Sequence, residues 1–207
     1  MIEVKVSTHP LVQHKLSLLR DKNTPSYLFR SLLEEITYLL AYEVTLDLPL
    51  NEFTVTTPFG EALGKEIATK LVLLPVLRAG LAMLPPFLHL FPVSVVGHLG
   101  FYRDEETLKP VKYYMKLPNL SSRDRVIILD PMLATGGTLM AILKELEGKG
   151  IREAYFVGIV GSAVGIQALS PFKGQLKIYL CAVDKQLNHK GFIIPGLGDA
   201  GDRIFAI

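Results

Sequence analysis

The chain has 207 residues, of which 49% are hydrophobic and 20% charged. This composition supplies a large core and excludes global disorder, so we expect residues 1–207 to form a single domain. The formal net charge of +2 gives no sign of a surface that coats nucleic acid. The start, MIEVKVSTHPLVQHK, carries charges and lacks the apolar stretch of a secretory signal, so we expect a cytoplasmic protein.

Two helices are expected first. One covers residues 10–20 and begins at HPLVQHKL. The second begins at Thr24-Pro25, a hydroxyl N-cap followed by proline at the first helical position. Apolar residues then recur at helical spacing to about Leu46. These helices form a layer ahead of the sheet.

The stretch from 79 to 102 contains no Asp, Glu, Lys or Arg and is long enough to suggest a membrane span. Pro85, Pro86 and Pro92 interrupt it, however, and proline inside a helix removes backbone hydrogen bonds. We therefore predict a helix near 80–91 and a strand near 93–99, both in the core, and no membrane span.

Continuous apolar runs alternate with helical patterns along the rest of the chain. A helix is expected over 138–149, and strands are expected at Leu71–Val76, Val93–Val96, Val126–Leu129, Ala154–Val160 and Leu176–Ala182. Strands that are apolar throughout and separated by helices favour a doubly wound α/β fold with a mostly parallel sheet. The polar insert at 102–118 predicts a hairpin or arm projecting from that sheet. The lone cysteine, Cys181, lies in an apolar run and is expected to be buried and without a disulfide.

The stretch VIILDPMLATGGT, from Val126 to Thr138, carries the strongest functional signal. In an open α/β sheet, ligands bind outside the carboxyl ends of the strands, where Asp130 is placed. Successive amides of residues 134–138, followed by a helix N-terminus, can wrap a phosphate group. An ordinary strand, turn and helix is the alternative for a Gly-Gly pair alone, but the acid and the two threonines make that alternative weaker.

This segment resembles the 5-phosphoribosyl-1-diphosphate (PRPP) motif of type I phosphoribosyltransferases, with Pro131 in place of the second acid. DPMLATGG is the variant found in uracil phosphoribosyltransferases. HPLVQHKL, LLPVLRAGLAM, FYRDEETLKPVKYY and IIPGLGDAGDRIF resemble further blocks of that family, in its order. The resemblance covers nearly the whole chain. It implies transfer of phosphoribose from PRPP to uracil, which yields uridine monophosphate and diphosphate in pyrimidine salvage.

The resemblance also assigns site residues. Those implied to bind PRPP are Arg78, Arg103, Asp130, Pro131, Met132, Leu133, Ala134, Thr135, Gly136, Gly137, Thr138 and Asp199. Asp199, Arg103 and Asp130 are the implied catalytic residues. Arg78 interrupts an apolar run, where an unpaired charge would be costly, and this favours a ligand role. Only the resemblance supports the same role for Arg103.

A C-terminal hood, residues 184–203, is implied to bind uracil through Ile193, Gly198, Asp199 and Ala200. Mg²⁺ is the implied cofactor, held mainly through diphosphate and water without dedicated protein ligands. The family suggests a homodimer or larger homo-oligomer. Whether GTP acts as an effector is left open.

The chain departs from the family pattern at three places: Val164 stands where an acid is usual, Phe192 replaces a tyrosine, and the end at 205–207 lacks the usual Gly-Thr. Two other functions therefore remain as alternatives. One is a nucleotide-sensing regulator that kept the PRPP fold, and the other is a transferase with altered base preference.

Overall fold

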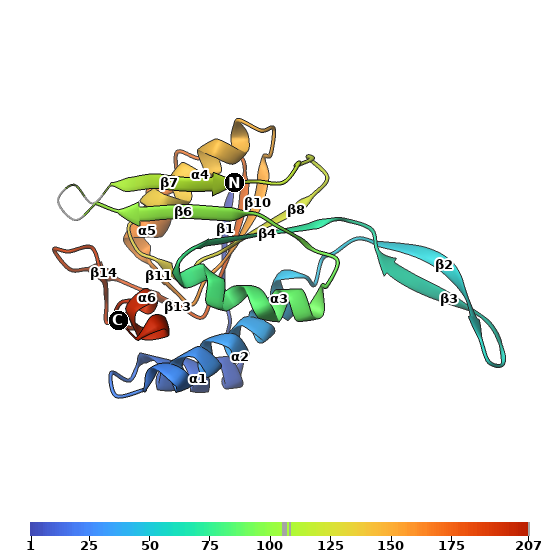
Figure 1. Cartoon of the computed structure of the whole chain (residues 1–207), viewed down its shortest axis with the longest axis horizontal. Coiled ribbons are helices and arrows are strands. Elements are labelled where there is room, and N and C mark those ends of the chain that lie inside the picture. The colour runs from blue at the N-terminus through green and yellow to red at the C-terminus, as the bar shows by residue number, and fades with distance from the viewer. Residues whose placement is uncertain (105–106, 108, 207) are drawn as a thin grey trace.

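The computed structural model describes residues 1–104, 107 and 109–206. Its centre is an eight-stranded sheet in the order β1-β12-β10-β8-β4-β6-β7, with β5 paired to β4 (Figure 1). The strands are β1 (Ile2–Val6), β4 (Leu71–Leu77), β5 (Val95–Val96), β6 (His98–Arg103), β7 (Pro110–Lys116), β8 (Arg125–Leu129), β10 (Glu153–Val157) and β12 (Gln175–Leu180). The strand pairs of this sheet are parallel, and only β6 and β7 run antiparallel within the described residues. The predicted mostly parallel α/β sheet is confirmed.

Helices cover both faces of the sheet because each central strand is apolar on both sides. Along β4, Leu71 and Leu73 belong to one buried cluster, and Val72 and Leu74 belong to the other. On the first face lie α1 (Pro10–Arg20), α2 (Ser26–Val44), the 3₁₀ helix η1 (Ala79–Met83), α3 (Leu84–Leu90) and α6 (Ala200–Phe205). The other face is covered by α4 (Gly137–Glu147) and α5 (Ala163–Ala168).

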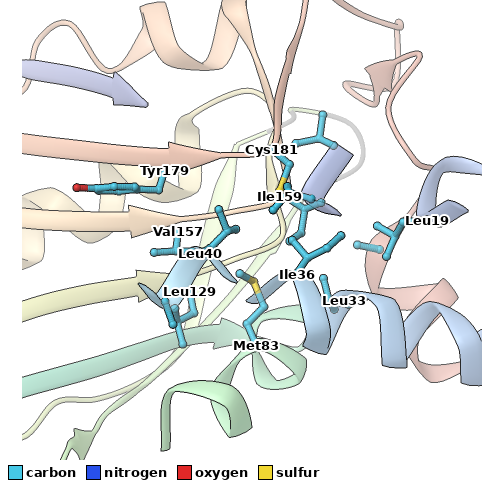
Figure 2. Close-up of a cluster of buried hydrophobic side chains, with 14 of the residues drawn as sticks. Leu19, Leu33, Ile36, Leu40, Met83, Leu129, Val157, Ile159, Tyr179 and Cys181 are labelled. Atoms are coloured by element: carbon cyan, nitrogen blue, oxygen red, sulfur yellow. The ribbon is translucent and has the colours of Figure 1, made fainter. Parts of the chain in front are cut away.

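Figure 2 shows the first cluster, which joins Ile36 and Leu40 of α2 to Leu129 and Val157 of the sheet. Cys181 lies in the same cluster and is 1% exposed. Burial raises the pKa of its thiol, so Cys181 behaves as a small apolar core residue, as predicted.

The N-terminal helices confirm two predictions and correct a detail. Helix α1 covers 10–20, and the side chain of His9 caps it by accepting a hydrogen bond from the Leu11 amide at 3.2 Å. Helix α2 begins at Ser26, with Pro25 at the cap position. The predicted N-cap role of Thr24 is therefore wrong, because its hydroxyl donates to the Leu18 carbonyl at 2.6 Å instead. Thr24 ties the end of α1 to the turn.

The apolar stretch at 79–102 is folded into the core in shorter pieces than predicted. The helix is divided into η1 and α3, and the strand into β5 and β6. Among the described residues, no helix has both the length and the apolar character needed to cross a membrane. Strand β1, which pairs with β12 at the sheet edge, was not predicted, because its exposed side chains give no continuous apolar run.

Two hairpins extend from this frame. The one predicted at 102–118 begins earlier, at His98, and its strands β6 and β7 form the edge of the main sheet; residues 105, 106 and 108 of its connection lie outside the described residues. A second hairpin, β2 (Leu50–Thr57) with β3 (Gly60–Ile67), projects far from the body (Figure 1). We call it the arm. It was not predicted, because its side chains are mostly exposed and its apolar residues are scattered.

Three short strands continue the central strands after a short irregular segment, which we call a break. β9 (Met132–Leu133), β11 (Val160–Ser162) and β13 (Ala182–Asp184) follow β8, β10 and β12 and pair in parallel with each other. Backbone hydrogen bonds bridge the breaks, for example from the Ile159 amide to the Pro131 carbonyl at 2.9 Å. The breaks place residues 130–136 above the carboxyl edge of the sheet.

Candidate active site

Residues 130–138, which the sequence predicts to bind phosphate and which we call the phosphate loop, run from the end of β8 into the first turn of α4. Gly136 adopts φ +77°, and a Cβ atom there would lie 2.4 Å from the Gly165 carbonyl oxygen, so only glycine fits. Helix α4 begins at Gly137, and its first amides have no partner within the helix. The predicted arrangement of strand, glycine turn and helix N-terminus is confirmed.

Asp130 opens this loop at the carboxyl end of β8 and is half-buried. Burial raises the pKa of its carboxyl group to about 7, although a hydrogen bond with the Met132 backbone works in the opposite direction. The environment therefore favours the neutral form and makes ionisation sensitive to pH near neutrality.

The C-terminal hood faces the loop from the opposite side. Strands β14 (Gln186–Leu187) and β15 (Ile193–Ile194) form a short antiparallel ladder. Gly198 follows with φ +83°, and Asp199 is the N-cap of α6, accepting a hydrogen bond from the Asp202 amide at 3.0 Å. Ile193 and Ala200 are buried, whereas Gly198 and Asp199 are exposed.

The loop and the hood line a single cavity of about 220 Å³. The predicted site residues that line it are Asp130, Met132, Leu133, Ala134, Thr135, Gly136, Thr138, Ile193, Gly198, Asp199 and Ala200. Pro131 and Gly137 do not line it. Pro131 is buried, and its carbonyl accepts hydrogen bonds from the Ile159 and Val160 amides, so its role is to hold the loop.

Arg78 is not part of this lining. Arg78 follows β4, and its side chain is 57% exposed, with the guanidinium 3.8 Å from the Asp202 carboxylate. Arg78 interrupts an apolar run of the sequence, but its side chain is not buried in that run, because β4 ends at Leu77. Its neighbour Ala79 lines the cavity, and the ligand role of Arg78 stays a prediction. The backbone of Arg103 ends β6, paired with Pro110. Its side chain lies outside the described residues.

Gly201, which belongs to the block IIPGLGDAGDRIF, also lines the cavity, and so do five residues that were not predicted: Ala79, Leu139, Phe156, Gly191 and Phe192. Phe156 could have been found, since it lies near the carboxyl end of a predicted strand. Phe192 was noted only as a departure from the family pattern. Its place beside Ile193 in the lining makes it a candidate determinant of base specificity.

In the part of the chain that the structure describes, the ionisable groups that line the cavity are the carboxyls of Asp130 and Asp199. Among the described residues, no group of three or more His, Cys, Asp or Glu side chains could hold a metal ion. Sparse oxygen donors of this kind fit a hydrated Mg²⁺ ion that is bound mainly through phosphate oxygens, because Mg²⁺ keeps several of its waters.

Comparisons with known proteins agree with this geometry. A uracil phosphoribosyltransferase from Dictyoglomus thermophilum is 52% identical over 203 residues, covering 98% of both chains, and one from Thermoanaerobacter sp. is 50% identical, covering 98% of this chain and 97% of the relative. The AQ2163 protein from Aquifex aeolicus superposes with a TM-score of 0.92 at 39% identity, covering 99% of this chain and 98% of that one. A hypoxanthine phosphoribosyltransferase from Staphylococcus aureus, with a TM-score of 0.53 at 11% identity over 82% of this chain and 83% of its own, shares the fold. The model of the family described as uracil phosphoribosyltransferase matches residues 6–206, and the chain belongs to this family.

Proposed function

We propose that this protein transfers 5-phosphoribose from PRPP to uracil, giving uridine monophosphate and diphosphate. The observation that carries the proposal is the shared cavity, because it joins a phosphate-binding loop to a rigid, glycine-rich hood. In the reaction a uracil ring nitrogen bonds to the anomeric carbon of ribose and loses its proton, while the bond from that carbon to diphosphate breaks and diphosphate leaves with the bonding electrons. The protein must hold both substrates and stabilise the charge that develops.

The phosphate loop is proposed to hold the ribose 5′-phosphate. The α4 N-terminus presents amides there, and the helix dipole favours an anion. The hydroxyls of Thr135 and Thr138 add donors on the cavity wall. Asp130, at the start of the loop, accepts hydrogen bonds from the ribose hydroxyls once it is ionised. The loop thereby fixes the anomeric carbon relative to the hood.

The leaving diphosphate is proposed to be neutralised by Arg78 and Arg103. Exposure of Arg78 suits this role, since its planar fork is available to a ligand that arrives from solvent. When bound, Mg²⁺ would supply positive charge to the diphosphate oxygens, and Asp199 would hold it through water. The Asp199 carboxylate, which lines the same cavity, is also proposed to stabilise the positive charge that develops on ribose in the transition state.

Uracil is proposed to bind under the hood. Its carbonyl oxygens and N–H groups match backbone groups from Ile193 and Gly198 to Ala200, in a compact turn that contains two positive-φ glycines, Gly196 and Gly198. Packing of Ile193 and Phe192 at this wall excludes water from the reacting atoms.

We further propose a homo-oligomer, supported by the arm. A two-stranded hairpin is marginally stable alone, and this one projects from the body with Phe53, Leu63 and the fully exposed Phe59 facing solvent (Figure 1). Contact with a second copy of the chain would bury these side chains.

The test of the proposed function is incubation of the protein with PRPP, Mg²⁺ and each nucleobase in turn. We expect ribosylation of uracil and none of adenine, guanine or hypoxanthine. Preference for a different base would instead support altered specificity, which Phe192 in the cavity wall makes the second candidate. Failure to consume PRPP with any base would overturn the enzyme assignment.

A further inference from the structure

We infer that Arg20 and Asp184 are positioning residues, an ion pair that holds the base-binding turn of the hood in its working geometry. The inference rests on the proposed function, because the turn matters only if uracil binds there. Neither residue lines the cavity. They act through Gly196, which lies between Ile193 and Gly198, two of the proposed uracil contacts.

The contacts around Gly196 form a closed network. Arg20 donates to both carboxylate oxygens of Asp184, at 2.8 and 2.9 Å, and to the Gly196 carbonyl at 2.7 Å. Asp184 in turn accepts from the Gly196 amide at 2.9 Å. Both backbone polar groups of Gly196 are thus bonded to this one pair. A guanidinium group and a carboxylate that form two parallel hydrogen bonds lie in one plane. The pair therefore fixes both the orientation of the Gly196 backbone and its distance from α1.

The turn itself requires an external constraint. Gly196 adopts φ +58°, and a Cβ atom at this position would lie 2.2 Å from the Ile193 carbonyl oxygen. A glycine in such a tight turn has a wide choice of backbone conformations when nothing holds it. The side chains of Arg20 and Asp184 are 23% and 10% exposed, so the pair is largely shielded from water. Although partial burial alone would raise it, the pKa of the Asp184 carboxyl is lowered by the hydrogen bonds from Arg20 and Gly196.

The pair also joins distant parts of the chain. Arg20 is the last residue of α1, and Asp184 ends β13, 164 residues later. A second arginine supports the same joint, since Arg203 donates to the Leu19 and Leu197 carbonyls at 2.7 and 2.8 Å. The C-terminal end of α1 therefore supports the hood through the side chain of Arg20 and the carbonyl group of Leu19.

The experiment compares wild type with Asp184→Asn, which keeps size but removes the charge. We expect the KM for uracil to rise on the order of 10-fold, while the KM for PRPP changes less than about twofold. The expected rise is below the ~10²-fold loss of activity that a displacement of a substrate contact by about 1 Å can cause. Hydrogen exchange of the amides at 191–201 should become faster. Arg20→Lys, which keeps charge but loses the fork, should act in the same direction.

Asp47→Asn is the matched control. Asp47 also accepts from two cationic side chains, Arg125 at 2.6 Å and Lys177 at 2.7 Å, but these lie at the starts of β8 and β12, away from the cavity. This variant should leave both the uracil KM and exchange at 191–201 unchanged. An Asp184→Asn protein with wild-type uracil KM and unchanged exchange would overturn the inference. If wild type does not use uracil at all, the proposed function fails, and the exchange comparison alone decides whether the pair orders the turn.

Discussion

At the scale of single residues, the environment of Asp130 favours its neutral carboxyl form, whereas its proposed role in binding ribose requires the carboxylate. The folded-state pKa of its carboxyl is raised from 3.8 to about 7, so between these values the folded chain keeps a proton that the unfolded chain releases. The protonated Asp130 carboxyl therefore contributes its full stabilisation below the pKa of the unfolded chain, 3.8. This stabilisation is lost as pH rises through the pKa of the folded chain, about 7. The site therefore destabilises the fold at the pH where the carboxylate is available to ribose.

Asp130→Asn should remove the loss of folding stability that wild type suffers as pH rises, because asparagine does not ionise. We expect the variant to match wild type in unfolding free energy near pH 4 and to exceed it by about 1–3 kcal/mol at pH 8, a range below the full linkage value because the carboxyl is partly exposed. Its KM for PRPP should rise. Chemical denaturation across this pH range is the measurement. A constant difference between the two proteins at all pH values would show that the carboxyl does not titrate differently on folding.

Asp199 combines a structural and a proposed catalytic role, and one substitution separates them. Asn caps helices about as well as Asp, so Asp199→Asn should keep the hydrogen bond to the Asp202 amide and leave the melting temperature unchanged. Loss of the charge should lower turnover by ~10²-fold, the range for one well-placed electrostatic group. Asp199→Ala, which also loses the cap, should cost about 1 kcal/mol of stability. Near-normal turnover of the Asn variant would restrict Asp199 to loop structure.

At the scale of elements, α5 acts as a support for the phosphate loop. Ser162 donates to the Ala134 carbonyl at 2.5 Å and caps α5 by accepting from the Gly165 amide at 2.8 Å. Gly165 packs so closely that a Cβ atom there would lie 2.2 Å from the Ala134 carbonyl oxygen. The start of α5 therefore determines where the loop backbone runs.

Gly165→Ala should push the loop out of place. We expect a loss of about 1–3 kcal/mol of stability from overpacking, together with a higher KM for PRPP and a smaller change for uracil. Gly148→Ala is the control, since its φ of −59° suits alanine and its nearest contact would be an ordinary 3.5 Å. Unchanged PRPP kinetics in Gly165→Ala would show that the loop tolerates displacement.

At the scale of the whole molecule, the arm carries apolar side chains that no other part of the described chain covers. Leu63 pairs with Thr54 on one face, and Phe59 stands at the turn, both open to solvent. A stable monomer has no need of such a feature, and exposed apolar side chains on a projecting element mark an interaction site.

Replacing Phe59 and Leu63 together by serine should shift the protein from oligomer to monomer in analytical ultracentrifugation. Thr56→Ser, a polar change on the same arm, should leave the distribution unchanged. A wild-type protein that sediments as a monomer, or a double-serine variant that stays oligomeric, would contradict the role of the arm.

The structural features that could be predicted from the sequence are those that depend on interactions between residues close together in the chain. Buried central strands such as Val126–Leu129 are apolar on both faces, and helix α1 has apolar residues at helical spacing, so both are visible in the sequence. The phosphate loop was also predictable, because a glycine turn before a helix N-terminus is built from consecutive residues. Strand β1 and the arm were not, since neither has a continuous apolar face.

The doubly wound sheet, the position of Asp130 and the glycine turn before α4 can be predicted from the amino-acid sequence, because the conformation of each segment depends on neighbouring side chains. Three features follow only from the folded chain: residues 191–201 line the same cavity as that turn, Arg78 is exposed, and Arg20 contacts Asp184 across 164 residues. Such contacts depend on how strands are ordered and where their connections return. No local pattern encodes that order, and it emerges only when the two hydrophobic faces of the sheet are covered.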